Sequence, residues 1–190
     1  MKSSKWKNIH ADILAWCEWK KVSVSLVAVV NLFLRYPEFR KLMDFRLTQM
    51  GGGGYKYLRF LTYPLSFYIN LYISEWNNKG GIKGGLLFEH GFSTIIFCKE
   101  LGERCCINQQ VTIGTGRGGA PTIGNRVRIY SGAKIIGDIT IGDDVIIGAN
   151  CVVNKSIPSH SVVVGVPARI VKTRKNENSP WISINLDKVK

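Results

Sequence analysis

The chain has 190 residues, of which 45% are hydrophobic and 21% are charged, as is typical of a globular protein rather than a disordered one. Lysine and arginine outnumber aspartate and glutamate by 26 to 13, which gives a formal net charge of +13. These basic residues are spread along the chain and do not interleave with a recognisable nucleic-acid motif, so the composition argues against nucleic-acid binding. The excess charge instead suits a phosphate-rich small molecule or an anionic surface.

The first 50 residues are predicted to be helical. Apolar residues recur at helical spacing from Ile9 to Cys17, the stretch 22–36 continues apolar as far as Pro37, and 38–50 resumes as another helix. The apolar part of 22–36 is too short to span a bilayer. We expect these apolar faces to pack against one another or against a neighbouring subunit. The alternative is peripheral contact with an anionic membrane surface, which the nearby tryptophans and lysines would suit.

Four glycines at 51–54 interrupt the helical pattern, because glycine is a poor helix former. The aromatic-rich stretch 55–73 follows, and we expect it to form a further helical segment that leads into the second half of the chain.

A branched apolar residue recurs about every six positions in the second half. The rungs of this ladder are Ile95, Leu101, Ile107, Ile113, Ile123, Ile129, Ile135, Ile141, Ile147 and Val153. A second small or apolar residue follows most rungs by four positions, and glycine often follows the rung directly. A period of six fits neither an α-helix, with about 3.6 residues per turn, nor a strand, with a period of about two. It fits a solenoid in which each hexapeptide forms one short strand and one corner.

The ladder is interrupted once, because Ile113 and Ile123 are ten residues apart instead of six. The extra residues lie near 116–120, and insertions in a solenoid form loops on one face, often the binding face. The rhythm fades at Pro158. We therefore predict a helical N-terminal region at 1–75, a repeat domain at 76–172 and a polar C-terminal tail at 173–190.

The chain has five cysteines, and no two of them form the Cys-x-x-Cys motif that is typical of metal sites. Cys98, Cys105 and Cys151 fall in predicted solenoid strands, where we expect them to act as small hydrophobic residues in a reduced core. The first ten residues are polar and charged, unlike a signal peptide. These features predict a cytoplasmic protein.

Five segments together resemble the hexapeptide-repeat acyltransferase superfamily. They are FEHG at 88–91, VTIGTG at 111–116, SGAKIIG at 131–137, IGAN at 147–150 and VGVPARIV at 164–171. The chain is most similar to the serine O-acetyltransferase branch, including its relatives in surface-polysaccharide synthesis. The resemblance covers about 76–172. It implies a mainly β fold, a left-handed parallel β-helix preceded by an α-helical segment.

The same resemblance implies acetyl transfer from acetyl-CoA to the hydroxyl of a small molecule or glycan. The site would lie between adjacent subunits of a homotrimer or a dimer of trimers. The resemblance also implies that no metal takes part, and that the enzyme forms no covalent intermediate because the acceptor oxygen attacks the thioester directly.

His90 is the expected general base, because a hydroxyl is a poor nucleophile and a histidine is suited to removing its proton during attack. The other two histidines, His10 and His160, lie outside the family motif. Glu75, fifteen residues before His90, matches an acid that orients the histidine in the family, although Glu replaces Asp. Glu89 matches an acidic residue that contacts the acceptor. Surface positions are the alternative for both glutamates.

The family binds CoA along a groove between coils, where small residues allow close approach and basic residues meet the phosphates. Candidates by position are the small residues Gly114, Thr115, Ser131, Gly132 and Ala149, and the basic residues Lys134, Arg169, Lys172 and Arg174. For each small residue the alternative is a conformational requirement of a solenoid corner.

The inserted loop departs from the serine enzymes, in which it ends in Asp-Arg-His-Pro. Here 118–121 reads Gly-Gly-Ala-Pro, so the arginine and histidine that contact the amino acid are missing unless Arg117 or another subunit replaces them. A sugar instead needs hydrogen-bonding and aromatic surfaces, which Phe92, Tyr130 and the aromatic segment 55–72 would supply. Packing is the alternative role for these aromatic residues.

We therefore predict an O-acetyltransferase that acts on a sugar in surface-polysaccharide synthesis. The alternatives are a serine O-acetyltransferase of cysteine biosynthesis with a substituted clamp, and a non-catalytic solenoid that serves assembly.

Overall fold

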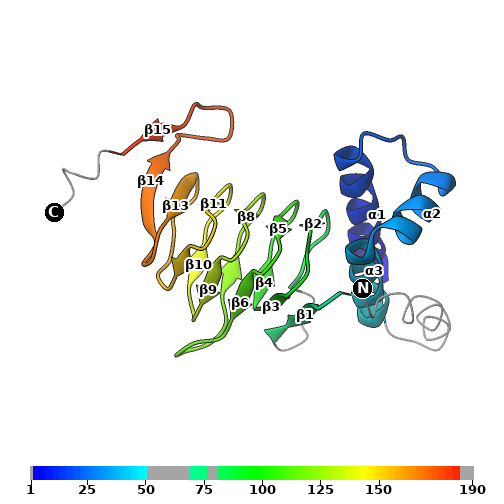
Figure 1. Cartoon of the computed structure of the whole chain (residues 1–190), viewed down its shortest axis with the longest axis horizontal. Coiled ribbons are helices and arrows are strands. Elements are labelled where there is room, and N and C mark those ends of the chain that lie inside the picture. The colour runs from blue at the N-terminus through cyan, green and yellow to red at the C-terminus, as the bar shows by residue number, and fades with distance from the viewer. Residues whose placement is uncertain (1, 51–68, 77–80, 185–190) are drawn as a thin grey trace.

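The computed structural model describes residues 2–50, 69–76 and 81–184, which form three helices followed by a β-solenoid (Figure 1). The helices are α1 (Lys2–Trp19), α2 (Leu26–Arg35) and α3 (Pro37–Met50), as predicted for this part of the chain. Ser25 caps α2, since its Oγ accepts a hydrogen bond from the Ala28 N–H at 3.1 Å. Pro37 opens α3, at a position where its missing N–H leaves no hydrogen bond unmade.

The solenoid consists of three sheets, here called A, B and C, that successive segments of the chain visit in turn. Sheet A contains β1 (Leu71–Glu75), β3 (Thr94–Cys98), β6 (Thr112–Gly114), β9 (Lys134–Ile136) and β12 (Val152–Val153). Sheet B contains β4 (Glu100–Leu101), β7 (Thr122–Ile123) and β10 (Thr140–Ile141). Sheet C contains β2 (Leu87–Glu89), β5 (Cys106–Asn108), β8 (Arg128–Ile129), β11 (Ile146–Ile147), β13 (Ser161–Val164), β14 (Arg169–Thr173) and β15 (Ile182–Ser183).

Neighbouring strands from β1 to β13 pair in parallel, which confirms the predicted parallel β-helix. Isolated bridges from Ile82 to Leu101 and from Ile141 to Ile157 extend sheet B to the first and last coils. Three stacks of corners join the sheets, and we name them the A-to-B, B-to-C and C-to-A corners after the sheets that they connect.

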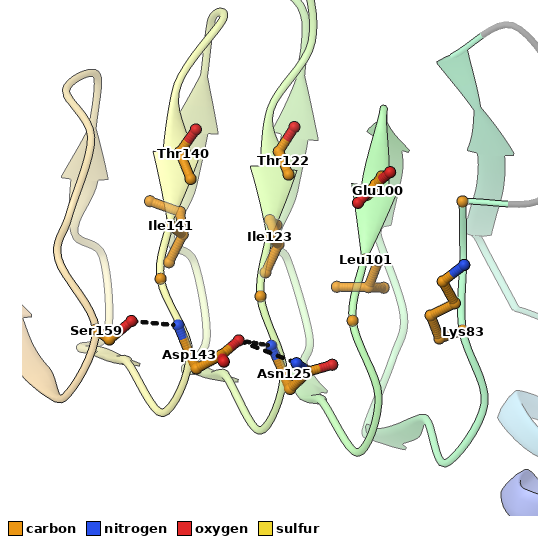
Figure 2. A pocket seen from close by; sticks show the side chains of 14 residues that line it. Lys83, Glu100, Leu101, Thr122, Ile123, Asn125, Thr140, Ile141, Asp143 and Ser159 are labelled. Carbon is orange, nitrogen blue, oxygen red and sulfur yellow. Dashed lines mark hydrogen bonds between the residues drawn. The ribbon is translucent and has the colours of Figure 1, made fainter. Parts of the chain in front are cut away.

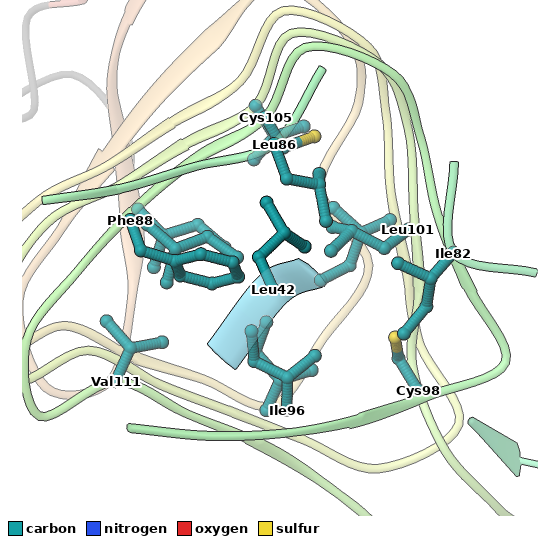
Figure 3. Close-up of a cluster of buried hydrophobic side chains, with 14 of the residues drawn as sticks. Leu42, Ile82, Leu86, Phe88, Ile96, Cys98, Leu101, Cys105 and Val111 are labelled. Atoms are coloured by element: carbon teal, nitrogen blue, oxygen red, sulfur yellow. The ribbon is translucent and has the colours of Figure 1, made fainter. Parts of the chain in front are cut away.

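The predicted ladder forms the core from Leu101 to Val153, whose side chains are fully buried. Its first rung is wrong. Ile95 is 47% exposed, and Ile96 points inward instead, as Figure 3 shows. The reason lies in the first A-to-B corner: Ile96 and Leu101 are five residues apart, whereas Ile135 and Ile141, which occupy the same positions in a later coil, are six apart. A strand slipped by one residue presents its other face.

The predicted helical stretch 55–73 is also corrected at its end. Residues 71–75 form β1, which pairs with β3 in sheet A, while 55–68 lie outside the described residues. At the other end of the chain, part of the predicted polar tail forms an antiparallel hairpin, because β15 pairs with β14.

The helices close the open end of the first coil. Leu42 of α3 lies at the centre of the triangular interior and is fully buried (Figure 3). Asp12 of α1 and Arg46 of α3 form an ion pair at 2.8 Å, with side chains 0% and 1% exposed. Asp12 Oδ1 accepts from the Leu86 N–H at 2.9 Å, and Arg46 Nη1 donates to the Ile82 carbonyl at 2.7 Å. The pair therefore joins two helices to the first coil.

Candidate functional site

His90 lies at the C-to-A corner of the first coil, between β2 and β3. Its backbone has a φ of 54°, and its side chain is exposed. Two backbone hydrogen bonds hold this corner, from the Phe92 N–H to the His90 carbonyl at 2.8 Å and from the Gln110 N–H to the Phe92 carbonyl at 2.9 Å. The imidazole is thus presented to solvent from a backbone that is anchored to the next coil.

Gly91 explains why this corner stays close to the helices. A Cβ there would lie 3.2 Å from Cβ of Phe88 and 3.3 Å from Cγ of Glu38, so α3 leaves little space for a side chain. Glu89, at the end of β2, is half-buried, and Phe92 is 46% exposed. The structure therefore brings together three predicted site residues, His90, Glu89 and Phe92, at one corner.

Gln109 is a candidate that sequence reasoning missed. It directly follows Asn108, which pairs with Glu89, so it stacks beside the corner of His90. Its Oε1 is buried and has no hydrogen-bond partner within the part of the chain that the structure describes. Buried polar atoms are normally paired, so an unpaired one next to a candidate base indicates a place for a ligand or water. In the sequence, the only feature that could have indicated this site was the pair Gln109 and Gln110 at a predicted solenoid corner.

Glu75 does not lie beside His90 in one chain. It ends β1 opposite Cys98, the last residue of β3, whereas His90 precedes the first residue of β3. The length of a five-residue strand, about 13 Å, therefore separates the two positions. The Glu75 side chain is buried, and its Oε1 accepts from the Ile82 N–H at 3.1 Å and from the Gln49 amide. These contacts tie α3 and the first position of sheet B together.

The predicted CoA residues fall into separate groups. Ser131, Gly132 and Ala149 lie at C-to-A corners, in the same stack as His90, while Gly114 and Thr115 lie at the opposite end of the sheet A strands. Arg169 and Lys172 are exposed on β14, beyond the last coil. Lys134 Nζ donates to the Gln110 carbonyl at 2.7 Å and to Thr112 Oγ1 at 3.1 Å, so the preceding coil already binds its ammonium group. The residues do not share one surface of a single chain.

Two of the predicted CoA-binding glycines differ in whether the fold itself requires a glycine at that position. Gly132 has a φ of +74°, and a Cβ there would lie 2.0 Å from Oδ1 of Asn150, so the corner itself requires glycine. Gly114 has room for a Cβ, whose nearest neighbour would be Cδ1 of Ile136 at 3.7 Å. Packing within this chain therefore does not explain the glycine at position 114.

The inserted loop, residues 115–121, extends from the A-to-B corner after β6. Gly116 and Gly119 form a tight antiparallel bridge, with the Gly116 N–H donating to the Gly119 carbonyl at 3.0 Å. The ion pair of Lys99 Nζ with Asp138 Oδ1, at 2.6 Å, lies against this turn. Arg117 is exposed on the loop, a strand length away from the corner of His90.

A polar groove of about 450 Å³ runs across several coils on sheet B (Figure 2). Thr122 and Thr140 line it from the strands, and Asn125, Asp143 and Ser159 line it from the B-to-C corners. Asp143 Oδ1 accepts from the Asn125 N–H at 2.6 Å, and Ser159 Oγ accepts from the Asp143 N–H at 3.0 Å. No residue predicted from the sequence to bind CoA or the acceptor lines it, although β7 begins directly after the inserted loop.

Burial disfavours the thiolate form of the cysteines. Cys98 and Cys105 are buried in the core, as predicted, and burial raises the pKa of each thiol to about 12. Burial also raises the pKa of Cys17, Cys106 and Cys151. Within the described residues, no group of three or more His, Cys, Asp or Glu side chains is placed to hold a metal ion.

Comparison with known proteins connects this geometry to one family. The bacterial transferase hexapeptide family model (six repeats) matches residues 120–155. Serine acetyltransferases of Staphylococcus xylosus and Synechococcus elongatus are 45% and 40% identical in the aligned region, which covers 46% of this chain in both cases. That region is 43% and 38% of the respective relatives, so the match spans less than half of their length.

Solved structures extend the similarity to most of the described fold. The serine acetyltransferase of Neisseria gonorrhoeae, in complex with serine, is 27% identical with a TM-score of 0.62, over 88% of this chain and 69% of that one. A serine acetyltransferase in complex with CoA is 27% identical with a TM-score of 0.58, over 89% and 70%. The solenoid matches the left-handed β-helix of these structures. In sequence and fold, the repeat region is thus similar to the hexapeptide-repeat acyltransferase superfamily, in its serine acetyltransferase-like branch.

Proposed function

We propose that this protein is an acetyl-CoA-dependent O-acetyltransferase with serine as its acceptor. The observation that carries the proposal is the exposed His90, anchored beside Glu89 in a chain whose repeat region resembles serine acetyltransferases. Each relative named above is a serine acetyltransferase, and one was solved with serine. The comparisons thus favour serine over the sugar that the inserted loop suggested.

In the proposed reaction, His90 removes the proton of the acceptor hydroxyl as its oxygen attacks the thioester carbon. The new C–O bond forms, the C–S bond breaks, and the proton passes through His90 to the leaving CoA sulfur. A base held by a rigid corner needs little rearrangement to reach this geometry. Glu89 offers a negative charge to the ammonium group of serine, and Gln109 offers an unpaired amide oxygen.

The complete site would form between two copies in a trimer. The separation of the predicted residues supports this arrangement, because His90 and Arg117 lie at opposite ends of the sheet A strands. A neighbouring copy that places its inserted loop against the corner of His90 would bring Arg117 to the carboxylate of serine. Glu75 lies at the same end as Arg117, but its buried carboxylate already holds Ile82 and Gln49, so its proposed role is to position α3 rather than to orient His90. Packing within the chain does not require a glycine at position 114. We propose that Gly114 lets CoA approach the backbone.

A sugar hydroxyl is the second candidate acceptor, and one specific observation favours it. The inserted loop has Gly-Gly-Ala-Pro at 118–121, without the arginine and histidine of serine enzymes. Phe92 and Tyr130, 46% and 42% exposed, lie at C-to-A corners and offer aromatic surfaces near His90.

Substitution of His90 tests the mechanism, and an acceptor comparison tests the substrate. His90→Ala is expected to lower acetyl transfer about a hundredfold or more, the usual contribution of a general base, with CoA binding retained. His10→Ala is the matched control, because His10 is exposed on α1. The assay follows release of the CoA thiol with serine and with a panel of glycans. Near-normal turnover by His90→Ala would refute the mechanism, and transfer to glycans but not to serine would reject the proposed acceptor.

A further inference from the structure

Helix α2 presents an apolar face to solvent. Its sequence, LVAVVNLFLR, contains two polar residues, Asn31 and Arg35. One side packs on the other helices, since Leu32 is 3% exposed and the Phe33 ring lies 5.9 Å from that of Phe39. A helix that is apolar all round is normally buried all round. Figure 1 shows instead that α2 lies on the outer side of α1 and α3, away from the solenoid.

Exposed apolar side chains lie along this side of the helix and in the segment before it. These residues, here called the α2 surface, are Val22, Val24, Leu26, Val27, Val30 and Leu34. Leu26 is 81% exposed, Val27 is 70% exposed and Leu34 is 66% exposed. Because residues 26, 30 and 34 are spaced four apart, their side chains lie in a stripe along one face of the helix. Exposed apolar groups that are gathered in this way mark an interaction site.

The charges around this stripe are of one sign. Lys21 and Arg35 are exposed at its two ends. No acidic residue occurs in the sequence between Glu18 and Glu38, and Glu18 is paired with Arg104 at 3.3 Å. A second copy docked through the same stripe would bring like charges near one another. An anionic surface would instead be attracted by both ends of the stripe.

We infer that the α2 surface docks on an anionic phospholipid bilayer, with α2 parallel to the membrane plane. The apolar stripe would enter the boundary between headgroups and acyl chains, and Lys21 and Arg35 would meet phosphate groups. No helix in the described part of the chain is long and apolar enough to cross a membrane. The inference is independent of the proposed reaction.

Vesicle flotation of the full chain tests the inference without acetyl-CoA or acceptor. The protein is mixed with vesicles of phosphatidylcholine alone or of phosphatidylcholine with phosphatidylglycerol. We expect binding to the mixed vesicles and weaker binding at high salt. Leu26→Gln with Leu34→Gln is expected to weaken binding about tenfold or more, since each leucine loses an apolar side chain from the interface. Lys21→Asn and Arg35→Gln are each expected to weaken it about fivefold.

Ile182→Gln is the matched control, because Ile182 is 65% exposed but lies on β15, at the far end of the solenoid. It should bind like the unmodified chain, and circular dichroism checks that every variant is folded. Equal binding to both vesicle types, or unchanged binding by the double leucine variant, would overturn the inference. So would an absence of vesicle binding together with a smaller oligomer for that variant in light scattering, which would assign the α2 surface to contact between copies.

Discussion

The two ends of the solenoid are each closed by an arginine–aspartate pair, in different surroundings. At the N-terminal end, the side chains of Asp12 and Arg46 are 0% and 1% exposed. At the C-terminal end, those of Asp144 and Arg174 are 11% and 16% exposed. Asp144 accepts from Arg174 Nε at 2.7 Å, lies 2.8 Å from Nδ1 of His160, and thereby ties the hairpin of β14 and β15 to the last B-to-C corners.

The surroundings shift the pKa values of the two aspartates in opposite directions. Burial raises the pKa of Asp12, although Arg46 opposes this shift. Burial also acts to raise the pKa of Asp144, but hydrogen bonds from Arg174 and His160 outweigh it, and the pKa of Asp144 is lowered. The N-terminal pair therefore positions the helices against a desolvation penalty, whereas the C-terminal pair stabilises the charged carboxylate. Two ion pairs of the same chemistry thus contribute differently to the two ends.

Removing the buried arginine should have the largest effect on this contrast. Arg46→Met leaves the charge of Asp12 buried without its partner, and we expect it to lower the free energy of unfolding by about 3–5 kcal/mol. Urea unfolding followed by circular dichroism measures the loss. The double variant Asp12→Leu with Arg46→Met should recover much of it, because no charge then remains buried. A single variant as stable as the unmodified chain would show that water reaches Asp12.

A smaller and more local effect is expected at the other end. Asp144→Asn weakens hydrogen bonds to two basic side chains and should lower local stability by about 1.5–3 kcal/mol. Hydrogen exchange should quicken at amides of β14 and β15 and stay unchanged in β5 and β6. Arg126→Met, which breaks an exposed pair with Glu177, is the control and should change exchange little. Equal quickening along the whole solenoid would contradict a local clamp.

Acidification should separate the two ends without any substitution. Since the pKa of Asp144 is lowered in the folded chain, its stabilisation is present above the unfolded value of about 3.9 and is lost as pH falls through the folded value. The pKa of Asp12 is instead raised in the folded chain, so protonation of Asp12 on acidification does not lower the stability of the fold. The protection factors of the β14 and β15 amides, which correct for slower intrinsic exchange in acid, should therefore fall below about pH 4, and Asp144→Asn should flatten that dependence. Earlier loss of the helices would reverse the comparison.

Much of the fold was predictable because one repeated distance determines it. From Leu101 to Val153, each inward residue follows from the period, since every coil repeats the environment of the one before. Ile95 failed because the first A-to-B corner is one residue shorter than the period of six requires, so Ile96 is the inward residue. The antiparallel β15 was missed because its two residues are exposed and carry no apolar pattern.

The candidate site was predictable in its residues and less so in its arrangement. His90 and Glu89 are adjacent in sequence and meet at one corner. Glu75 was expected beside them from a spacing of fifteen residues, but that spacing is less than one coil and ends at a different corner. The unpaired oxygen of Gln109 depends on burial by neighbouring coils, which a single sequence does not display.

The vertical stacking of coils also gives unfolding a direction. Each coil pairs with the coils directly before and after it, so the structure unzips from whichever end opens first. Leu42 plugs the first coil, and Asp12 holds the Leu86 N–H immediately before β2. The C-terminal hairpin lacks such a plug among the described residues, and it should detach first. His90 follows β2 directly, so the candidate base lies where the chain is last to open.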